Sequence, residues 1–346
     1  MKTFYILIIK FGATGDVLRT TTILHGLKRE YPQAHITWIV EDKRSFDLLK
    51  NNQFINNLVS YEAIRLIPFK DEKFDLLISL DEDPHALALA SATNAKEKLG
   101  YGLDEQGQIK AFNPESQYAF QLRISDDLKF RKNQKTYQQI IFEMARLHYK
   151  RDPYILAIDR RDKTYAEQIL KNFGVAHGEL VIGLNTGAGP RFAFKSWTVK
   201  GYLGLVHRLK EQLKCKIMLL GGPEEEQKNR EIVNQCKDLV LAPGTHHSIT
   251  QFAALVDQCH LIVSGDTVGM HIGIALKKSV IAIFGPTCPQ EIDLYDRGIK
   301  IVSPIECAPC YKNFCDFKVT CMDKILIDDV YNAICKLLPQ EAKPKI

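Results

Sequence analysis

The sequence predicts an α/β protein built from two Rossmann-like domains that face each other across a central cleft. Three observations favour this fold class: short apolar runs alternate with segments of helical periodicity, the alternation occurs in two series, and a polar stretch separates the series. A chain of 346 residues is also long for one ordinary core. With Arg151-Asp152-Pro153 as the linker, we place the first domain at 1–153 and the second at 154–326.

The first domain opens with a strand at residues 4–9, whose continuous apolar run suits a sheet covered on both faces. A glycine-containing turn at 10–16 follows, and apolar residues then recur at helical spacing until Tyr31 and Pro32. Residues 36–40 form the next strand and complete a βαβ unit. The other elements expected here are a strand at 74–80, helices at 84–98 and 137–149, and a charged, turn-rich segment at 126–135.

The second domain repeats the alternation of helix and strand, which predicts a second sheet of parallel strands. A final apolar helix within 327–346 is expected to cross back onto the first domain. The elements between them are helices at 165–173, 202–213, 224–235, 249–257 and 270–276, and strands at 180–185, 216–222, 260–264 and 279–284.

Composition excludes several classes of protein. The net charge of +5 is spread along the chain, whereas a nucleic-acid binder more often gathers its basic residues in one stripe. The charge suits an anionic substrate and an anionic membrane surface equally well. No apolar run approaches the roughly 20 residues that span a bilayer, and no secretory signal is evident. We therefore expect a cytoplasmic protein.

Four cysteines lie within one loop-like segment, with the spacing C-x2-C-x4-C-x5-C. A chain without an export signal keeps its thiols reduced, so a cluster of this kind favours a metal site over disulfides. Four thiolates suit a structural zinc or iron ion, and because they close the coordination sphere, no catalytic metal is expected. Four free thiols that pack a loop are the alternative. The predicted ligands are Cys307, Cys310, Cys315 and Cys321.

Parallel α/β sheets bind ligands beyond the carboxyl ends of their strands, so the turns after the strands are the candidate sites. In the first turn, Gly12 and Gly15 allow a sharp bend, and Asp16 opens the helix that follows. An aspartate at this place is often only a helix cap. It also suits a general base that takes a proton from an attacking hydroxyl.

Three turns of the second domain carry polar groups suited to a phosphate or a sugar. Thr186 and Gly187, with Lys195 soon after, supply a hydroxyl, amides and an ammonium for a phosphate, although a plain surface loop fits them as well. Glu225 is the acidic residue we favour for a ribose, against simple stabilisation of the helix N-terminus. Asp266 suits sugar hydroxyls, and His271 suits either a ligand or the core.

This ordered set of turns resembles glycosyltransferase family 9, the ADP-heptose transferases that build the lipopolysaccharide inner core and have the GT-B fold. The resemblance covers nearly the whole chain. Val268 stands where many relatives have a glycine, and Gly269 follows it. The motifs that carry the resemblance are Gly15-Asp16, Lys195-Ser196-Trp197, Gly221-Gly222-Pro223 with the acidic residue after it, Asp266-Thr267 with His271, and Phe284-Gly285-Pro286-Thr287.

The resemblance implies an inverting transfer of heptose without a covalent intermediate. Asp16 would be the general base, Lys195 would balance the diphosphate leaving group, and Thr14 and Gly15 would lie on the acceptor side. The amides after the Asp266-Thr267 turn, at Val268 and Gly269, would hold the donor. The cysteine motif also resembles an iron-binding motif of protein heptosyltransferases, so both a lipid-linked core oligosaccharide and a protein remain possible acceptors, with peripheral contact at the inner membrane.

Other functions stay open from the sequence. The donor is another nucleotide sugar in one alternative, and in a second the chain is a sugar-nucleotide epimerase of similar architecture. A third alternative is a nucleotide-binding protein without catalysis. The joint presence of Asp16, Lys195 and Asp266 argues against the third.

Overall fold

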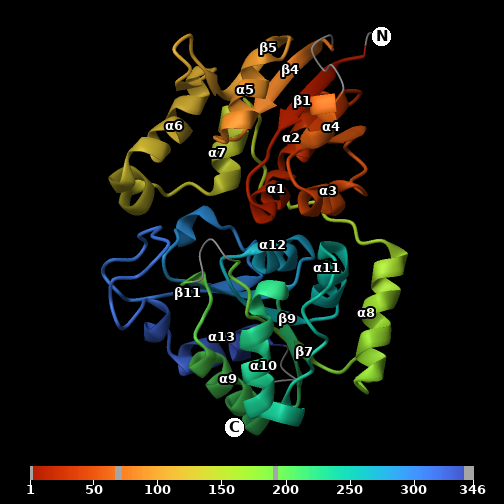
Figure 1. Cartoon of the computed structure of the whole chain (residues 1–346), viewed down its shortest axis with the longest axis vertical. Coiled ribbons are helices and arrows are strands. Elements are labelled where there is room, and N and C mark those ends of the chain that lie inside the picture. Colours follow the sequence, from red (N-terminus) through yellow and green to blue (C-terminus); the bar gives the residue numbers. More distant parts are fainter. Residues whose placement is uncertain (1–2, 67–71, 190–193, 339–346) are drawn as a thin grey trace. The chain divides into compact units, whose positions relative to one another are not determined.

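A computed structural model describes residues 3–66, 72–189 and 194–338 of the chain (Figure 1). It divides into two compact units. The first comprises Met1–Ala157 together with Gln290–Asp293, and the second comprises Ile158–Pro289 and Leu294–Ile346. The chain passes between them after Ala157, beyond the linker that the sequence suggested.

The first unit contains a six-stranded sheet in the order β3-β2-β1-β4-β5-β6. Its strands are parallel except for β6, which runs antiparallel to β5. Side chains of β1 alternate between two cores, because Ile6 and Ile8 join one apolar cluster and Leu7 and Ile9 join another. The sheet is therefore covered on both faces. Its strands are β1 (Tyr5–Ile9), β2 (His35–Val40), β3 (Asn57–Ser60), β4 (Phe74–Ser79), β5 (Ala95–Leu103) and β6 (Ile109–Ala111).

The helix expected after the first strand is two helices, α1 (Thr14–Thr20) and α2 (Ile23–Glu30). Buried Thr21 and Thr22 separate them, and both hydroxyls bond to carbonyls three residues back, which competes with regular helical bonding. The other helices of this unit are α3 (Lys43–Leu49), α4 (Tyr61–Leu66), α5 (Pro84–Ala92), α6 (Gln117–Ile124) and α7 (Tyr137–Met144).

The second unit contains a five-stranded, wholly parallel sheet in the order β11-β10-β9-β7-β8. Figure 1 shows its helices on both sides of the sheet. Helix α9 packs against both α10 and α13, and helix α11 packs against both α8 and α12. The strands are β7 (Val181–Asn185), β8 (Lys216–Leu220), β9 (Leu261–Gly265), β10 (Ser279–Phe284) and β11 (Gly298–Val302); the helices are α8 (Arg160–Asn172), α9 (Val199–Gln212), α10 (Glu226–Cys236), α11 (Ile249–Asp257), α12 (Val268–Ala275) and α13 (Ile327–Leu337).

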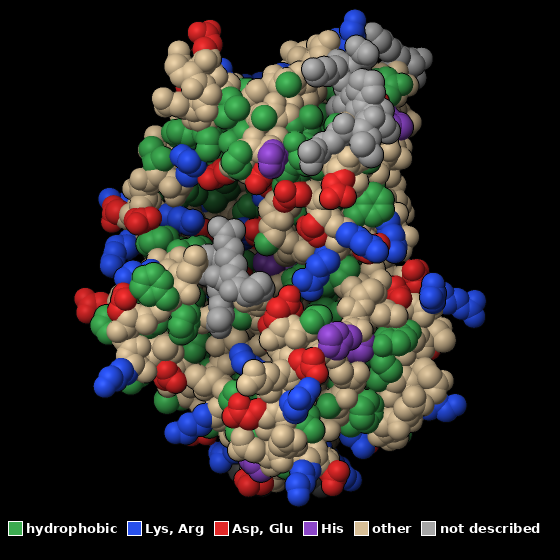
Figure 2. All heavy atoms as spheres, in the orientation of Figure 1, with side chains coloured by type: hydrophobic (Ala, Val, Ile, Leu, Met, Phe, Trp, Pro, Cys, Tyr) green, Lys and Arg blue, Asp and Glu red, His purple; other side chains and the backbone are tan. Residues whose placement is uncertain are grey.

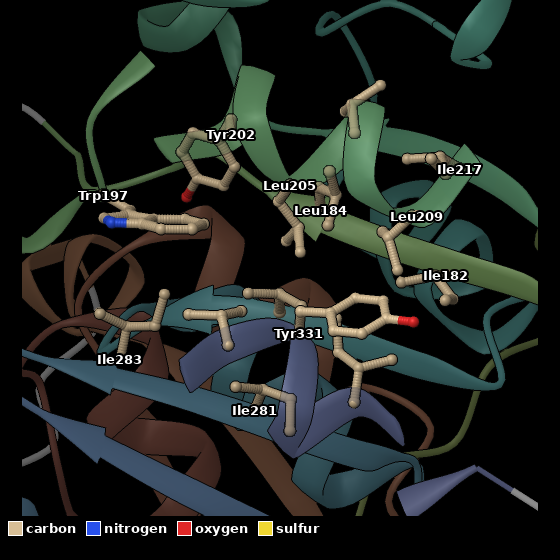
Figure 3. Packing of buried hydrophobic residues seen from close by; sticks show 14 of the residues in the cluster. Ile182, Leu184, Trp197, Tyr202, Leu205, Leu209, Ile217, Ile281, Ile283 and Tyr331 are labelled. Atoms are coloured by element: carbon tan, nitrogen blue, oxygen red, sulfur yellow. The ribbon is translucent and has the colours of Figure 1, made fainter. Parts of the chain in front are cut away.

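The core of the second unit lies between its sheet and the α9/α13 side (Figure 3). Trp197 and Tyr202 are almost fully buried there, with ring centroids 5.4 Å apart in an edge-to-face arrangement. Val330, Tyr331 and Ile334 of α13 belong to this same core. The expectation that the last helix returns to the first domain is therefore wrong for α13, because its apolar face is buried in the second unit; residues 339–346 lie outside the described chain.

Two predictions from the apolar pattern need correction. The helix expected at 84–98 ends at Ala92, and β5 begins at Ala95. This strand was missed because it contains Lys96, Glu97 and Lys98, and charged residues are unusual in a strand that is paired on both sides. Strands β3, β6 and β11 were also missed, and all three lie at sheet edges, where burial imposes less of an apolar pattern.

Charged residues of both signs are interspersed over the face drawn in Figure 2. Within the described residues, no helix is both long enough and apolar enough to cross a membrane.

Candidate functional site

Each sheet has one position at which the strand order reverses, and ligands of open α/β sheets bind beyond the carboxyl ends of the strands at that position. In the first sheet it lies between β1 and β4, and in the second it lies between β7 and β9. Residues at the carboxyl ends of these four strands and in the segments after them form two polar clusters, one in each unit. We call them the base cluster of the first unit and the donor cluster of the second.

Asp16 of the base cluster is not a helix cap. Ala13 is the N-cap residue of α1, and that end has no side-chain capping hydrogen bond. The Asp16 carboxylate instead forms an ion pair with Arg19, with 2.8 Å between Oδ1 and Nη2. About a third of the Asp16 side chain is exposed (36%), which leaves it within reach of a substrate. Asp16 therefore lies in the first turn of α1 without being its N-cap residue, and its role as a general base stays a prediction.

Lys10 and Asp81 join the ends of β1 and β4 in the same cluster. The Lys10 ammonium lies 2.8 Å from Asp81 Oδ2, and both side chains are buried. Burial disfavours the charged lysine, but the neighbouring acidic groups Tyr137, Asp81 and Asp16 outweigh it and raise the pKa of Lys10. Gly12, with a φ of +38°, leaves room for this ammonium, since a Cβ there would lie 2.9 Å from Lys10 Nζ. A fixed positive charge thus stands close to Asp16.

Asn185 organises the donor cluster at the end of β7. Its side-chain amide donates to Ser264 Oγ at 2.8 Å and to Thr267 Oγ1 at 2.9 Å. Tyr202 in turn donates its hydroxyl hydrogen to the Asn185 carbonyl at 2.8 Å. A Cβ on Gly269 would lie 2.5 Å from Asn185 Nδ2, so a glycine there lets the first turn of α12 approach the amide.

Lys195, Asp266 and His271 converge although they are far apart in the sequence. Lys195 Nζ lies 3.4 Å from Asp266 Oδ2, and His271 Nε2 lies 3.8 Å from Asp266 Oδ1. The lysine offsets the negative charge of Asp266, which would otherwise repel a diphosphate. Gly265 permits this approach, because a Cβ on it would lie 2.1 Å from the Lys195 carbonyl oxygen. His271 is buried at the start of α12.

Glu225 holds the loop that follows β7. One carboxylate oxygen accepts from the amides of Ala188 and Gly189 at 3.1 and 3.4 Å, and the other accepts from Gly222 at 2.9 Å. Glu225 also lies beside Gly187, since a Cβ on that glycine would lie 3.6 Å from Glu225 Oε2. Glu225 thus shapes this loop, and its contact with a ribose stays a prediction. Thr186 is fully buried, and its hydroxyl hydrogen is shared between Asn229 Oδ1 at 2.6 Å and the Leu220 carbonyl oxygen at 3.1 Å. These contacts give Thr186 a structural role in the loop, and its contact with the donor stays a prediction.

Sequence reasoning missed several residues of the two clusters. Lys228 of α10 donates to Ser196 Oγ at 2.5 Å, and burial lowers the pKa of its ammonium. The sequence around Lys228 does not distinguish it from a surface lysine of an amphipathic helix. Lys10 directly follows the apolar strand β1, and Asn185 is the last residue of the apolar strand β7. A polar residue at the carboxyl end of such a strand is a signal that could have identified both.

The four predicted metal ligands lie in the second unit, between β11 and α13. Cys307 is exposed, Cys310 and Cys315 are half-buried, and Cys321 is buried. Burial, together with the three neighbouring thiols, raises the pKa of Cys321 to about 11. Within the described residues, however, no three or more histidine, cysteine or acidic side chains are arranged to hold a metal ion. The metal site therefore stays a prediction.

Comparisons with known proteins bear on the family and the fold of the chain. The family model described as glycosyltransferase family 9 (heptosyltransferase) matches residues 68–320. The lipopolysaccharide core heptosyltransferase OpsX of Haemophilus influenzae is 23% identical over 86% of this chain and 84% of its own. Two solved structures share the fold: a family 9 glycosyltransferase of Veillonella parvula (TM-score 0.78, 18% identity, 97% and 98% coverage) and the Escherichia coli ADP-heptose lipopolysaccharide heptosyltransferase II (TM-score 0.69, 19% identity, 98% and 99% coverage).

Proposed function

The chain belongs to glycosyltransferase family 9, with the two Rossmann-like units of the GT-B fold, and from that premise we propose that it transfers heptose from ADP-heptose to a hydroxyl of the lipopolysaccharide core. The relatives it matches are named for heptose transfer in that pathway. The alternative is a protein acceptor, and the experiment below distinguishes it from a lipopolysaccharide-core acceptor.

The donor cluster supplies the groups that an activated sugar requires. Lys195 balances the charge that develops on the departing diphosphate, and the amides of Val268 and Gly269 at the start of α12 favour the same negative charge. Asp266, whose charge Lys195 offsets, accepts hydrogen bonds from sugar hydroxyls. Glu225 keeps the loop at Gly187 in place and offers its carboxylate to the ribose.

The base cluster supplies the proton acceptor. Asp16 takes the proton of the acceptor hydroxyl while the oxygen of that hydroxyl attacks the anomeric carbon. The bond from this carbon to the diphosphate breaks at the same time, with inversion. The ADP leaves with the electron pair of that bond, and no covalent sugar–enzyme intermediate forms. No step of this reaction is assigned to a metal ion. Any zinc or iron held by the four cysteines would have a structural role only.

The family match over residues 68–320 is the observation that carries the proposal. To test it, the protein is incubated with ADP-heptose, GDP-mannose or UDP-glucose, each with a heptose-free lipid-linked core acceptor or with a peptide acceptor. We expect nucleotide release and an acceptor heavier by one heptose only with ADP-heptose and the core acceptor. Release from another donor, transfer to the peptide alone, or binding of ADP-heptose without turnover would each refute it.

A further inference from the structure

The turn that carries Asp16 has little support of its own. Helix α1 spans only Thr14–Thr20, and its N-terminus lacks a side-chain cap. A general base needs its carboxylate fixed within a fraction of an ångström, so other residues must restrict this side chain. Two residues do so, one from α1 itself and one from α7.

Arg19 makes the direct contact with the Asp16 carboxylate. Its side chain is only 12% exposed, and the guanidinium carbon lies 3.7 Å from the centroid of the Tyr137 ring. Its other terminal nitrogen lies 3.8 Å from Glu291. An exposed pair with i,i+3 spacing would contribute little to the stability of a helix. Stacking and burial make this pair different, because they hold the guanidinium plane in one orientation.

Tyr137 holds α1 at a second point. Its hydroxyl lies 2.7 Å from Thr20 Oγ1, and Thr20 donates its own hydroxyl hydrogen to the Asp16 carbonyl at 2.7 Å. Tyr137 therefore acts on the Asp16 side chain through Arg19 and on the Asp16 backbone through Thr20. It is itself well anchored, because it is the first residue of α7 and lies within the capping box formed by Thr136 and Gln139.

We propose that Arg19 and Tyr137 are positioning residues that hold the Asp16 carboxylate in the orientation needed for proton transfer. The proposal rests on the proposed role of Asp16 as the general base. Arg19 fixes the carboxylate and favours its ionised form, while the Tyr137 ring fixes Arg19. Both act on the rate of the chemical step and leave donor binding to the second unit.

The test compares steady-state kinetics of four variants with saturating acceptor. Arg19→Met and Tyr137→Leu should each lower kcat about 10–100-fold, the range expected for a misplaced reacting group, with the KM for the donor within about twofold of the wild type. Arg19→Lys should recover part of the loss because it keeps the charge, and Tyr137→Phe should lose least because it keeps the ring. Arg44→Met, on an exposed site of α3, is the matched control and should not change kcat.

A double-mutant cycle separates positioning from a direct contact with substrate. If Arg19 acts through Asp16, then Arg19→Met should cause no further loss of kcat in the Asp16→Asn background. A further loss there, or full kcat in folded Arg19→Met and Tyr137→Leu, would overturn the positioning proposal alone. Full kcat in Asp16→Asn would instead overturn the proposed base, and the positioning proposal with it. Thermal unfolding confirms that each variant is folded.

Discussion

The base cluster and the donor cluster occupy equivalent places in their sheets, yet they are built differently. The base cluster relies on ionic contacts: Lys10 pairs with Asp81, and Arg19 pairs with Asp16. At the donor cluster, neutral groups span the two strands, since the Asn185 amide bonds Ser264 and Thr267. The ion pair of Lys195 with Asp266 lies beside that framework.

Under the proposed function, the corresponding ends of the two sheets serve two different tasks. A carboxylate that must accept a proton benefits from fixed cations that orient it and keep it ionised. A diphosphate brings its own negative charge, so the protein offers a lysine, amide donors and neutral hydrogen bonds without an excess of carboxylates. If the comparison is right, changes in the base cluster should alter kcat and changes in the donor cluster should alter donor affinity.

The largest expected effect comes from Asp16→Asn. Loss of the general base should lower kcat about 10²–10⁴-fold, while the Kd for ADP stays within about twofold, because the donor cluster is untouched. Rapid-quench kinetics and calorimetry with ADP measure the two quantities. Asp126→Asn, an exposed carboxylate of the same unit, is the control. Weaker ADP binding in Asp16→Asn would mean that the two tasks are not divided as we propose.

Lys195→Met should have the next largest effect. The variant loses a charged hydrogen bond to the diphosphate and the positive charge that offsets Asp266. ADP binding should therefore weaken about 10–150-fold, which corresponds to about 1.5–3 kcal/mol. Calorimetry measures the Kd, and exposed Lys200→Met serves as the control. Unchanged ADP affinity would remove Lys195 from the donor site.

Gly265→Ala probes the backbone contact behind Lys195. The added methyl would overlap the Lys195 carbonyl, so we expect a loss of about 1–3 kcal/mol in the free energy of unfolding together with weaker ADP binding. Gly174→Ala is the control in the same unit: its φ of +68° makes alanine unfavourable, but a Cβ there meets no neighbour. Both variants should lose stability, and only Gly265→Ala should lose affinity. Equal affinities would show that the contact does not shape the site.

The smallest effect on activity is expected at the cysteine cluster. A zinc or iron ion with four thiolate ligands would be structural, so Cys310→Ser combined with Cys315→Ser should lower the metal content from about one ion per chain and lower Tm, with little change in kcat. Plasma mass spectrometry measures the metal, and Cys215→Ser is the control. Metal-free wild-type protein would show that these thiols only pack the loop.

The sequence alone determined the two α/β series, the strands with continuous apolar runs and the turns that carry the candidate residues. A strand buried on both faces has a continuous apolar run, which identifies it without knowledge of its neighbours in the fold. It did not determine the edge strands β3, β6 and β11, nor β5, whose charged residues obscure its strand pattern. The tertiary structure decided which side chains meet. Lys10 reaches Asp81, and Arg19 stacks on Tyr137 of α7, through sheet order and helix packing that no local pattern encodes. The family resemblance therefore identified Asp16, whereas only the folded chain showed what holds it.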